Sequence, residues 1–138
     1  MNVYIDSSVV LRRLRREAKP IAGWAEWEHA YASVLLRVEV LRTIDRMRLS
    51  GAVVDDEVAE LTTSAHAIFD VIDFVALSPP IIYRAEQSFR TALGTLDALH
   101  LSTALWLAEA GSVVLTFVTH DSELALAARS VNFLVQGA

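Results

Sequence analysis

The stretch from Gly94 to Leu105 reads GTLDALHLSTAL and predicts the helix around which the rest of the chain is organised. Gly94 and Thr95 are typical of a loop and a helix cap, good helix formers run from residue 96 to residue 109, and Gly111 is a natural stop. Asp97 lies in the first turn, above a face of small and apolar side chains. A partly buried carboxylate needs a cation or several hydrogen bonds. The simpler interpretation of Asp97 is a favourable charge at a helix N-terminus.

Composition limits the class of protein. The chain has 138 residues, which predicts a single domain over residues 1–138, and 54% of them are hydrophobic, which excludes a disordered chain. It has no cysteine, so disulfides and thiolate metal sites are excluded. A formal net charge of −5 argues against a passive nucleic-acid binder. It does not exclude a nuclease whose clustered acids are neutralised by metal ions.

The chain carries no sign of export or membrane insertion. Its first residues enter a strand pattern without a basic leader, which argues against a signal peptide. No apolar run approaches the ~20 residues of a membrane span. We therefore expect a cytoplasmic protein without a membrane partner. One early segment is basic, and it fits either a solvated helix face or phosphate contacts: Arg12, Arg13, Arg15, Arg16 and Lys19.

Strand and helix patterns alternate along the chain. Strands are predicted at residues 2–5, 31–33, 71–77, 113–118 and 132–135. Helices are predicted at residues 7–16, 20–28, 34–49, 55–69, 81–91, 96–109 and 122–129. This alternation predicts an α/β sandwich with a mainly parallel central sheet flanked by helices.

Four acids are expected at one edge of that sheet, because ligands of open parallel sheets bind beyond the carboxyl ends of the strands. Asp6 ends the first strand, and Asp121 follows the strand at 113–118. Glu39 lies early in the helix after the second strand, and Asp97 opens its own helix. Converging carboxylates repel one another unless a cation such as Mg²⁺ or Mn²⁺ binds them. Such a metal activates water and braces a phosphate, which indicates phosphodiester hydrolysis.

Each of these acids also has a simpler interpretation. Asp6 and Asp121 are good helix N-caps. Glu39 shares a polar sector with Arg42 and Arg46 and fits an intrahelical ion pair. Spacing alone does not prove that the acids converge, so these alternatives stay open.

Four motifs, in order, resemble those of PIN-domain ribonucleases, specifically the VapC toxins of bacterial toxin–antitoxin systems. They are YIDSS at 4–8, SVLLRVEVLR at 33–42, LDALHLSTA at 96–104 and VTHD at 118–121. The third motif is the most specific, and the resemblance spans nearly the whole chain. It implies a PIN-like three-layer sandwich and a metal-dependent endoribonuclease. In that enzyme Asp6, Glu39, Asp97 and Asp121 would bind Mg²⁺ or Mn²⁺, and metal-activated water would attack an RNA phosphodiester.

The resemblance also implies supporting residues and partners. Ser8 and Thr119 match hydroxyl residues that would orient the carboxylates. Family members form homodimers and bind a cognate antitoxin protein that occludes the site. Glu123 is expected to be a simple first-turn helix acid, and His100 and His120 are expected to have structural or surface roles.

Two other functions fit parts of the sequence. The main alternative is a binding or regulatory module that keeps the PIN scaffold without activity, although the intact acids argue against it. A different α/β phosphoryl-transfer domain is disfavoured, because Ser8 stands where an Asp-x-Asp phosphatase has its second acid. A receiver domain is disfavoured because the one lysine, Lys19, follows the first helix. The scattered glycines form no nucleotide-binding motif.

Overall fold

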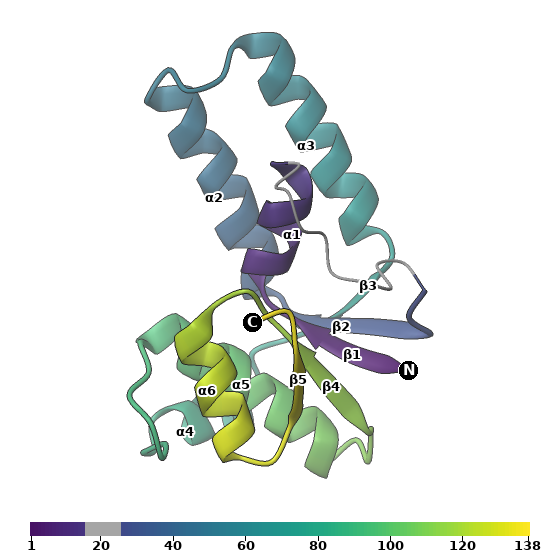
Figure 1. Ribbon diagram of the computed structural model, residues 1–138, viewed down its shortest axis with the longest axis vertical. Coiled ribbons are helices and arrows are strands. Elements are labelled where there is room, and N and C mark those ends of the chain that lie inside the picture. Colours follow the sequence, from purple (N-terminus) through teal and green to yellow (C-terminus); the bar gives the residue numbers. More distant parts are fainter. Residues whose placement is uncertain (16–25) are drawn as a thin grey trace.

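A computed structural model describes residues 1–15 and 26–138 (Figure 1). The elements follow in the order β1 (Asn2–Ile5), α1 (Ser7–Leu14), β2 (His29–Ser33), α2 (Leu35–Leu49), α3 (Asp55–Phe69), β3 (Ile72–Val75), α4 (Pro79–Ala85), α5 (Thr95–Glu109), β4 (Leu115–Val118), α6 (Ser122–Ser130) and β5 (Leu134–Gln136). Strand and helix alternate, which confirms the predicted α/β class.

The five strands form one sheet in the order β3-β2-β1-β4-β5, and every neighbouring pair is parallel. β1 therefore lies in the centre, and its last residue, Ile5, pairs with Val118 at the end of β4. From β1 the chain continues to β2, which pairs with one edge of β1, whereas β4 pairs with the opposite edge of β1. The order thus reverses between β1 and β4, and such a switch point is where open parallel sheets bind ligands.

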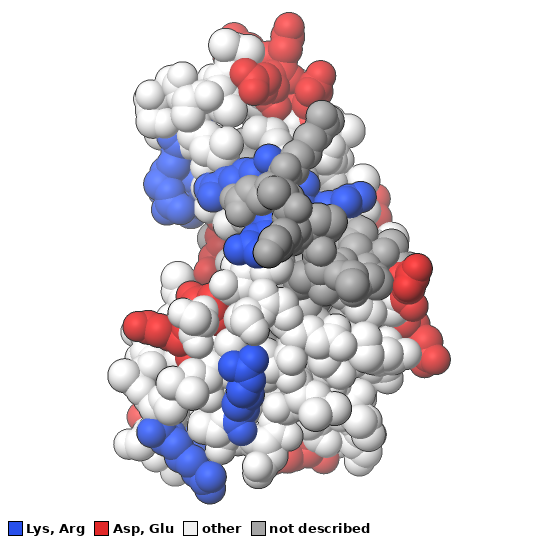
Figure 2. Space-filling model, viewed as in Figure 1, with Lys and Arg blue, Asp and Glu red and all other residues white. Residues whose placement is uncertain are grey.

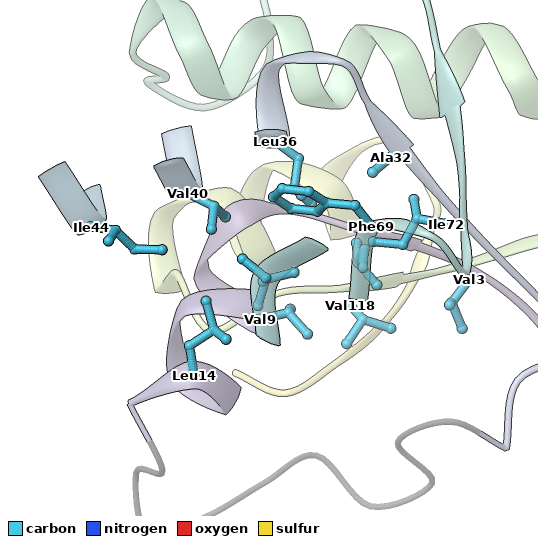
Figure 3. Close-up of a cluster of buried hydrophobic side chains, with 13 residues drawn as sticks. Val3, Val9, Leu14, Ala32, Leu36, Val40, Ile44, Phe69, Ile72 and Val118 are labelled. Atoms are coloured by element: carbon cyan, nitrogen blue, oxygen red, sulfur yellow. The ribbon is translucent and has the colours of Figure 1, made fainter. Parts of the chain in front are cut away.

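Alternation along β1 builds a hydrophobic core on each face of the sheet. Val3 and Ile5 belong to the first cluster, whereas Tyr4 belongs to the second. The first cluster packs α1, α2 and α3 against the sheet (Figure 3), and its labelled members are Val3, Val9, Leu14, Ala32, Leu36, Val40, Ile44, Phe69, Ile72 and Val118. The second cluster packs α5 and α6 on the opposite face (Figure 1), with Leu101, Phe117 and Leu124 fully buried. The predicted three-layer sandwich is confirmed.

The predicted helix at 81–91 is wrong in both of its boundaries. α4 spans Pro79–Ala85. The two prolines occupy its first turn, where no backbone N–H is needed, and therefore start the helix. Beyond Ala85, Phe89 packs against the second cluster and lies 4.2 Å from the Arg84 guanidinium. This packing takes precedence over the helical pattern after the first two turns.

Other boundaries differ by smaller amounts. β2 begins at His29, and Glu26, Trp27 and Glu28 are not helical as predicted, whereas residues 20–25 of the predicted 20–28 helix lie outside the described residues. α1 ends at Leu14, before the predicted residue 16, which also lies outside them. β3 and β4 are shorter than the predicted strands at 71–77 and 113–118, and β5 begins later than the predicted strand at 132–135. β4 starts only at Leu115, because that residue is the first to pair with β1. Gly94 is the N-cap of α5, and Thr95 is already helical. Within the described ranges, no helix has the length and apolar character of a membrane span.

Candidate active site

Asp6 stands directly after β1 and is only 4% exposed. It is the N-cap residue of α1, but its side chain makes no capping hydrogen bond, so the capping interpretation of this carboxylate is wrong. Oδ1 instead accepts a hydrogen bond of 2.7 Å from the Ser8 hydroxyl. The pKa of Asp6 is raised to about 6, mainly by burial and to a smaller extent by the nearby charge of Asp97, against the opposing effects of Ser8, His100 and Thr119. The site therefore holds a carboxyl group that is costly to ionise.

Thr119 and Asp121 follow β4 and approach the same place. The Thr119 hydroxyl is buried and accepts a hydrogen bond from the backbone N–H of Asp121 at 3.0 Å. Asp121 does cap its helix, because Oδ1 accepts the N–H of Leu124 at 3.0 Å. The Ser8 hydroxyl accepts the N–H of His120 at 2.9 Å and lies 3.4 Å from that of Thr119. These contacts join the ends of β1 and β4.

Asp97 lies in the first turn of α5 and is partly buried. Its pKa is raised, first by burial and next by the charge of Asp121, with smaller effects from Glu39 and Glu123. Glu123 is exposed in the first turn of α6 and acts here only through its charge. Acids that are more than twenty residues away in sequence thus help to raise the pKa of Asp97.

Glu39 reaches the site from α2, and its partner differs from the expected one. The predicted ion pair with Arg42 or Arg46 is absent among the described residues, and Arg46 donates to the Thr43 hydroxyl instead. Oε1 of Glu39 lies 2.5 Å from Nε2 of His100, a residue of α5 that is 1% exposed. Sequence reasoning missed this contact. The available signal was a histidine one turn after Asp97 on a helix with little polar surface, because a buried polar ring requires a partner.

The four acids fit a divalent metal ion in their chemistry. Carboxylate oxygens are ligands for hard cations such as Mg²⁺ and Mn²⁺. A cation would offset both the burial of Asp6 and the repulsion that raises the pKa of Asp97. In the part of the chain that the structure describes, no three Asp, Glu or His side chains already stand close enough to form a ligand group. The structure thus places the four predicted acids along one edge of the sheet. Among the described residues they are not yet close enough together to form a complete metal-binding group.

The remaining histidines of interest lie outside this arrangement. His120 is partly exposed, and its Nδ1 lies 2.8 Å from the carbonyl oxygen of Gly137. His29 pairs with Asp73 at 3.4 Å, and both side chains are exposed. These contacts fit the structural or surface role that was expected for His120.

Comparison with known proteins gives a consistent set of relatives. A profile of the family described as "PIN domain" matches residues 3–129. Ribonuclease VapC47 of Mycobacterium tuberculosis is 30% identical over 139 residues, covering 96% of this chain and 93% of that protein. Similar solved folds include VapBC2 from Rickettsia felis bound to a promoter DNA fragment (TM-score 0.67, 11% identity, 99% of this chain and 98% of that chain). They also include PAE2754 from Pyrobaculum aerophilum (TM-score 0.66, 16% identity, 99% and 84%).

Proposed function

This chain belongs to the PIN domain family, and from that membership we propose that it is a metal-dependent endoribonuclease, the toxin of a toxin–antitoxin pair. The observation that supports the proposal most is the placement of Asp6, Asp97, Asp121 and Glu39 along one edge of the sheet, beside the switch point between β1 and β4. This arrangement occurs in a chain that is 30% identical to a ribonuclease.

In the proposed reaction these four carboxylates hold Mg²⁺ or Mn²⁺. When bound, such an ion lowers the pKa of a coordinated water and neutralises charge on a phosphodiester. Ser8 holds Asp6, and the backbone between Thr119 and Asp121 is held by the Thr119 hydroxyl. Water adds to phosphorus while one P–O bond breaks, which leaves one strand end as a phosphate monoester and the other as a hydroxyl.

Positive charge near the acids supports RNA as the substrate. Arg42 and Arg46 are exposed on α2, one and two turns beyond Glu39, and neither has an acidic partner among the described residues. Figure 2 shows Arg side chains gathered over α2 and the end of α1, above a hollow at the left edge whose lower border carries Asp and Glu. An RNA backbone that follows the basic border would place a phosphate near the acids.

We also propose an antitoxin protein and a second copy of the chain as partners. The first similar fold named above is that of a VapBC complex, and so is VapBC-1 from nontypeable Haemophilus influenzae (TM-score 0.64, 12% identity, 99% of this chain and 97% of that chain). In such a pair the antitoxin would cover the four acids and keep RNA away from them.

The test is cleavage of a total small-RNA pool by the purified protein, with Mg²⁺, with EDTA, and with the Asp97→Asn variant. We expect discrete fragments only when both the metal and Asp97 are present, and end-mapping of those fragments would identify the RNA. Fragments that persist in EDTA or in a folded Asp97→Asn variant would refute the proposal.

A further inference from the structure

His100 is almost completely buried and bridges two elements that carry the proposed site. Its Nδ1 lies 3.0 Å from the Tyr4 hydroxyl, and its Nε2 lies 2.5 Å from Oε1 of Glu39. The Tyr4 hydroxyl in turn accepts the backbone N–H of Ser33 at 3.1 Å. A continuous buried chain of hydrogen bonds therefore runs from the end of β2, through β1 and α5, to the carboxylate on α2.

The carboxylate of Glu39 can only accept a hydrogen bond, which indicates that the ring nitrogen of His100 facing it, Nε2, carries a proton. Because Tyr4 already accepts from Ser33, its own proton is available for Nδ1 of His100. Burial raises the pKa of the Tyr4 phenol, so the hydroxyl keeps that proton. Nδ1 accepts, and the ring proton of the neutral imidazole must then be on Nε2, which faces Glu39. A protonated ring also has Nε2–H, so donation to Glu39 does not depend on the charge of His100.

The contact with His100 restrains the side chain of Glu39. Glu39 projects from a helix surface, and its side chain is 21% exposed. One carboxylate oxygen is held by His100, while Oε2 has no hydrogen-bond partner among the described residues. A restrained carboxylate loses less rotational freedom when it binds a ligand.

We propose that His100 is a positioning residue, whose Nε2–H holds the Glu39 carboxylate toward the other three acids. The inference rests on the proposed metal site. Tyr4 fixes the ring: its phenol stacks on Phe117 with centroids 5.2 Å apart and meets the imidazole edge-on at 6.2 Å. His100 itself does not contact RNA or metal in this proposal.

The test compares two substitutions that retain different halves of the imidazole. In His100→Gln the amide nitrogen takes the place of Nε2, whereas in His100→Asn it reaches only the place of Nδ1. Calorimetric titration with Mn²⁺ should give nearly wild-type affinity for His100→Gln and roughly 10- to 100-fold weaker affinity for His100→Asn. Thermal unfolding without metal should be similar in the two variants. Equal Mn²⁺ affinity of His100→Asn and wild type would overturn the proposal, as would equal loss in both variants.

A double-mutant cycle tests whether His100 acts through Glu39. In a Glu39→Gln background, adding His100→Asn should cause little further loss of Mn²⁺ affinity, whereas independent, additive losses would contradict the proposal. Binding that is lost in Glu39→Gln but kept in His100→Asn refutes the positioning role alone. Binding that Glu39→Gln leaves unchanged refutes the proposed ligand set as well. The titration contains no RNA, so failure to cleave RNA bears only on the proposed function.

A spectroscopic measurement on the metal-free wild type remains decisive if a variant does not fold. Nitrogen-15 spectra of the imidazole should show the proton on Nε2 and a hydrogen-bonded Nε2–H resonance that shifts in Glu39→Gln. A neutral ring with its proton on Nδ1 would overturn the proposal.

Discussion

The hydroxyl of Ser8 donates a hydrogen bond of 2.7 Å to the carboxylate of Asp6. The same oxygen accepts the backbone N–H of His120 at 2.9 Å, so a single hydroxyl joins the ends of the two central strands. A hydrogen bond to an ionised carboxylate favours its charged form, and Ser8 therefore lowers the pKa of Asp6 against the larger, opposite effect of burial.

Replacing Ser8 by alanine should move metal binding to higher pH. The pKa of Asp6 is about 6 with the hydroxyl in place and should rise without it. Mn²⁺ affinity measured across the pH range should therefore reach half of its maximum at a higher pH in Ser8→Ala. Ser8→Thr retains a hydroxyl and Ser7→Ala changes a neighbour, so both should resemble wild type. An unchanged midpoint in Ser8→Ala would contradict the role of Ser8.

Asp6→Asn should stabilise the metal-free protein at neutral pH. The folded pKa is about 6 against an ordinary value of 3.8, so the stabilising contribution of Asp6 is complete below pH 3.8 and is lost as the pH rises through about 6. At neutral pH the ionised group costs on the order of 3 kcal/mol. Urea unfolding in EDTA should show Asp6→Asn to be more stable by roughly 1–3 kcal/mol at neutral pH, with the difference disappearing near about pH 4. Equal stability at neutral pH would count against this explanation.

Metal should stabilise the wild-type fold. At a free Mn²⁺ concentration of about 100 times Kd, linkage predicts an increase of about 2.7 kcal/mol in the free energy of unfolding. Asp97→Asn should lose most of this increase. Asp73→Asn is the matched control, because Asp73 is exposed and paired with His29. If Mn²⁺ stabilises all three proteins equally, Asp97 is not a ligand.

Charge reversal on α2 should weaken RNA binding. The measurement uses an Asp97→Asn background, in which we expect no cleavage. There, Arg42→Glu with Arg46→Glu should raise Kd and reduce the dependence of log Kd on log salt by about 1 for each lost phosphate contact. Arg129→Glu, in the last turn of α6, is the control of equal charge change per residue. Fluorescence anisotropy with a labelled RNA gives both quantities. The same Kd in the double variant and the control would exclude α2 as the RNA-binding border.

Two glycines at the ends of α5 should respond differently to a side chain. A Cβ at Gly111 would lie 2.7 Å from the carbonyl oxygen of Leu107, a backbone atom, so Gly111→Ala should destabilise by roughly 1–3 kcal/mol. A Cβ at Gly94 would meet nothing within 4 Å, and Gly94 is an N-cap in extended conformation. Gly94→Ser should therefore be neutral or slightly stabilising. Thermal unfolding measures both changes, and a neutral Gly111→Ala would contradict the close approach.

Local sequence patterns predicted the helices and strands well where all local signals point to the same structure. The helix Asp55–Phe69 was predicted with its observed boundaries, because acids at its start and continuous periodicity agree. The helix after Pro79 was misplaced, because proline marks both a break and a favourable first turn. Its end depends on where Phe89 packs, and that position is a tertiary property.

The position of the four candidate acids at one edge of the sheet was predictable from the sequence, but the contacts of their side chains were not. Strand ends and helix starts placed Asp6, Asp97 and Asp121 at one edge, because parallel strands share their carboxyl ends. The bond between Glu39 and His100 joins residues 61 positions apart on two helices. No periodicity within one helix specifies which side chain of another helix lies opposite, so this contact required the three-dimensional arrangement.

The central position of β1 also makes the order of synthesis matter. Of the four acids, Asp6 is translated first. The strand β4, which pairs with β1, begins only at Leu115, and Asp121 is translated later still. A nascent chain that stops before β4 cannot bring these acids together. The proposed nuclease therefore cannot assemble its four acids until most of its length has been translated.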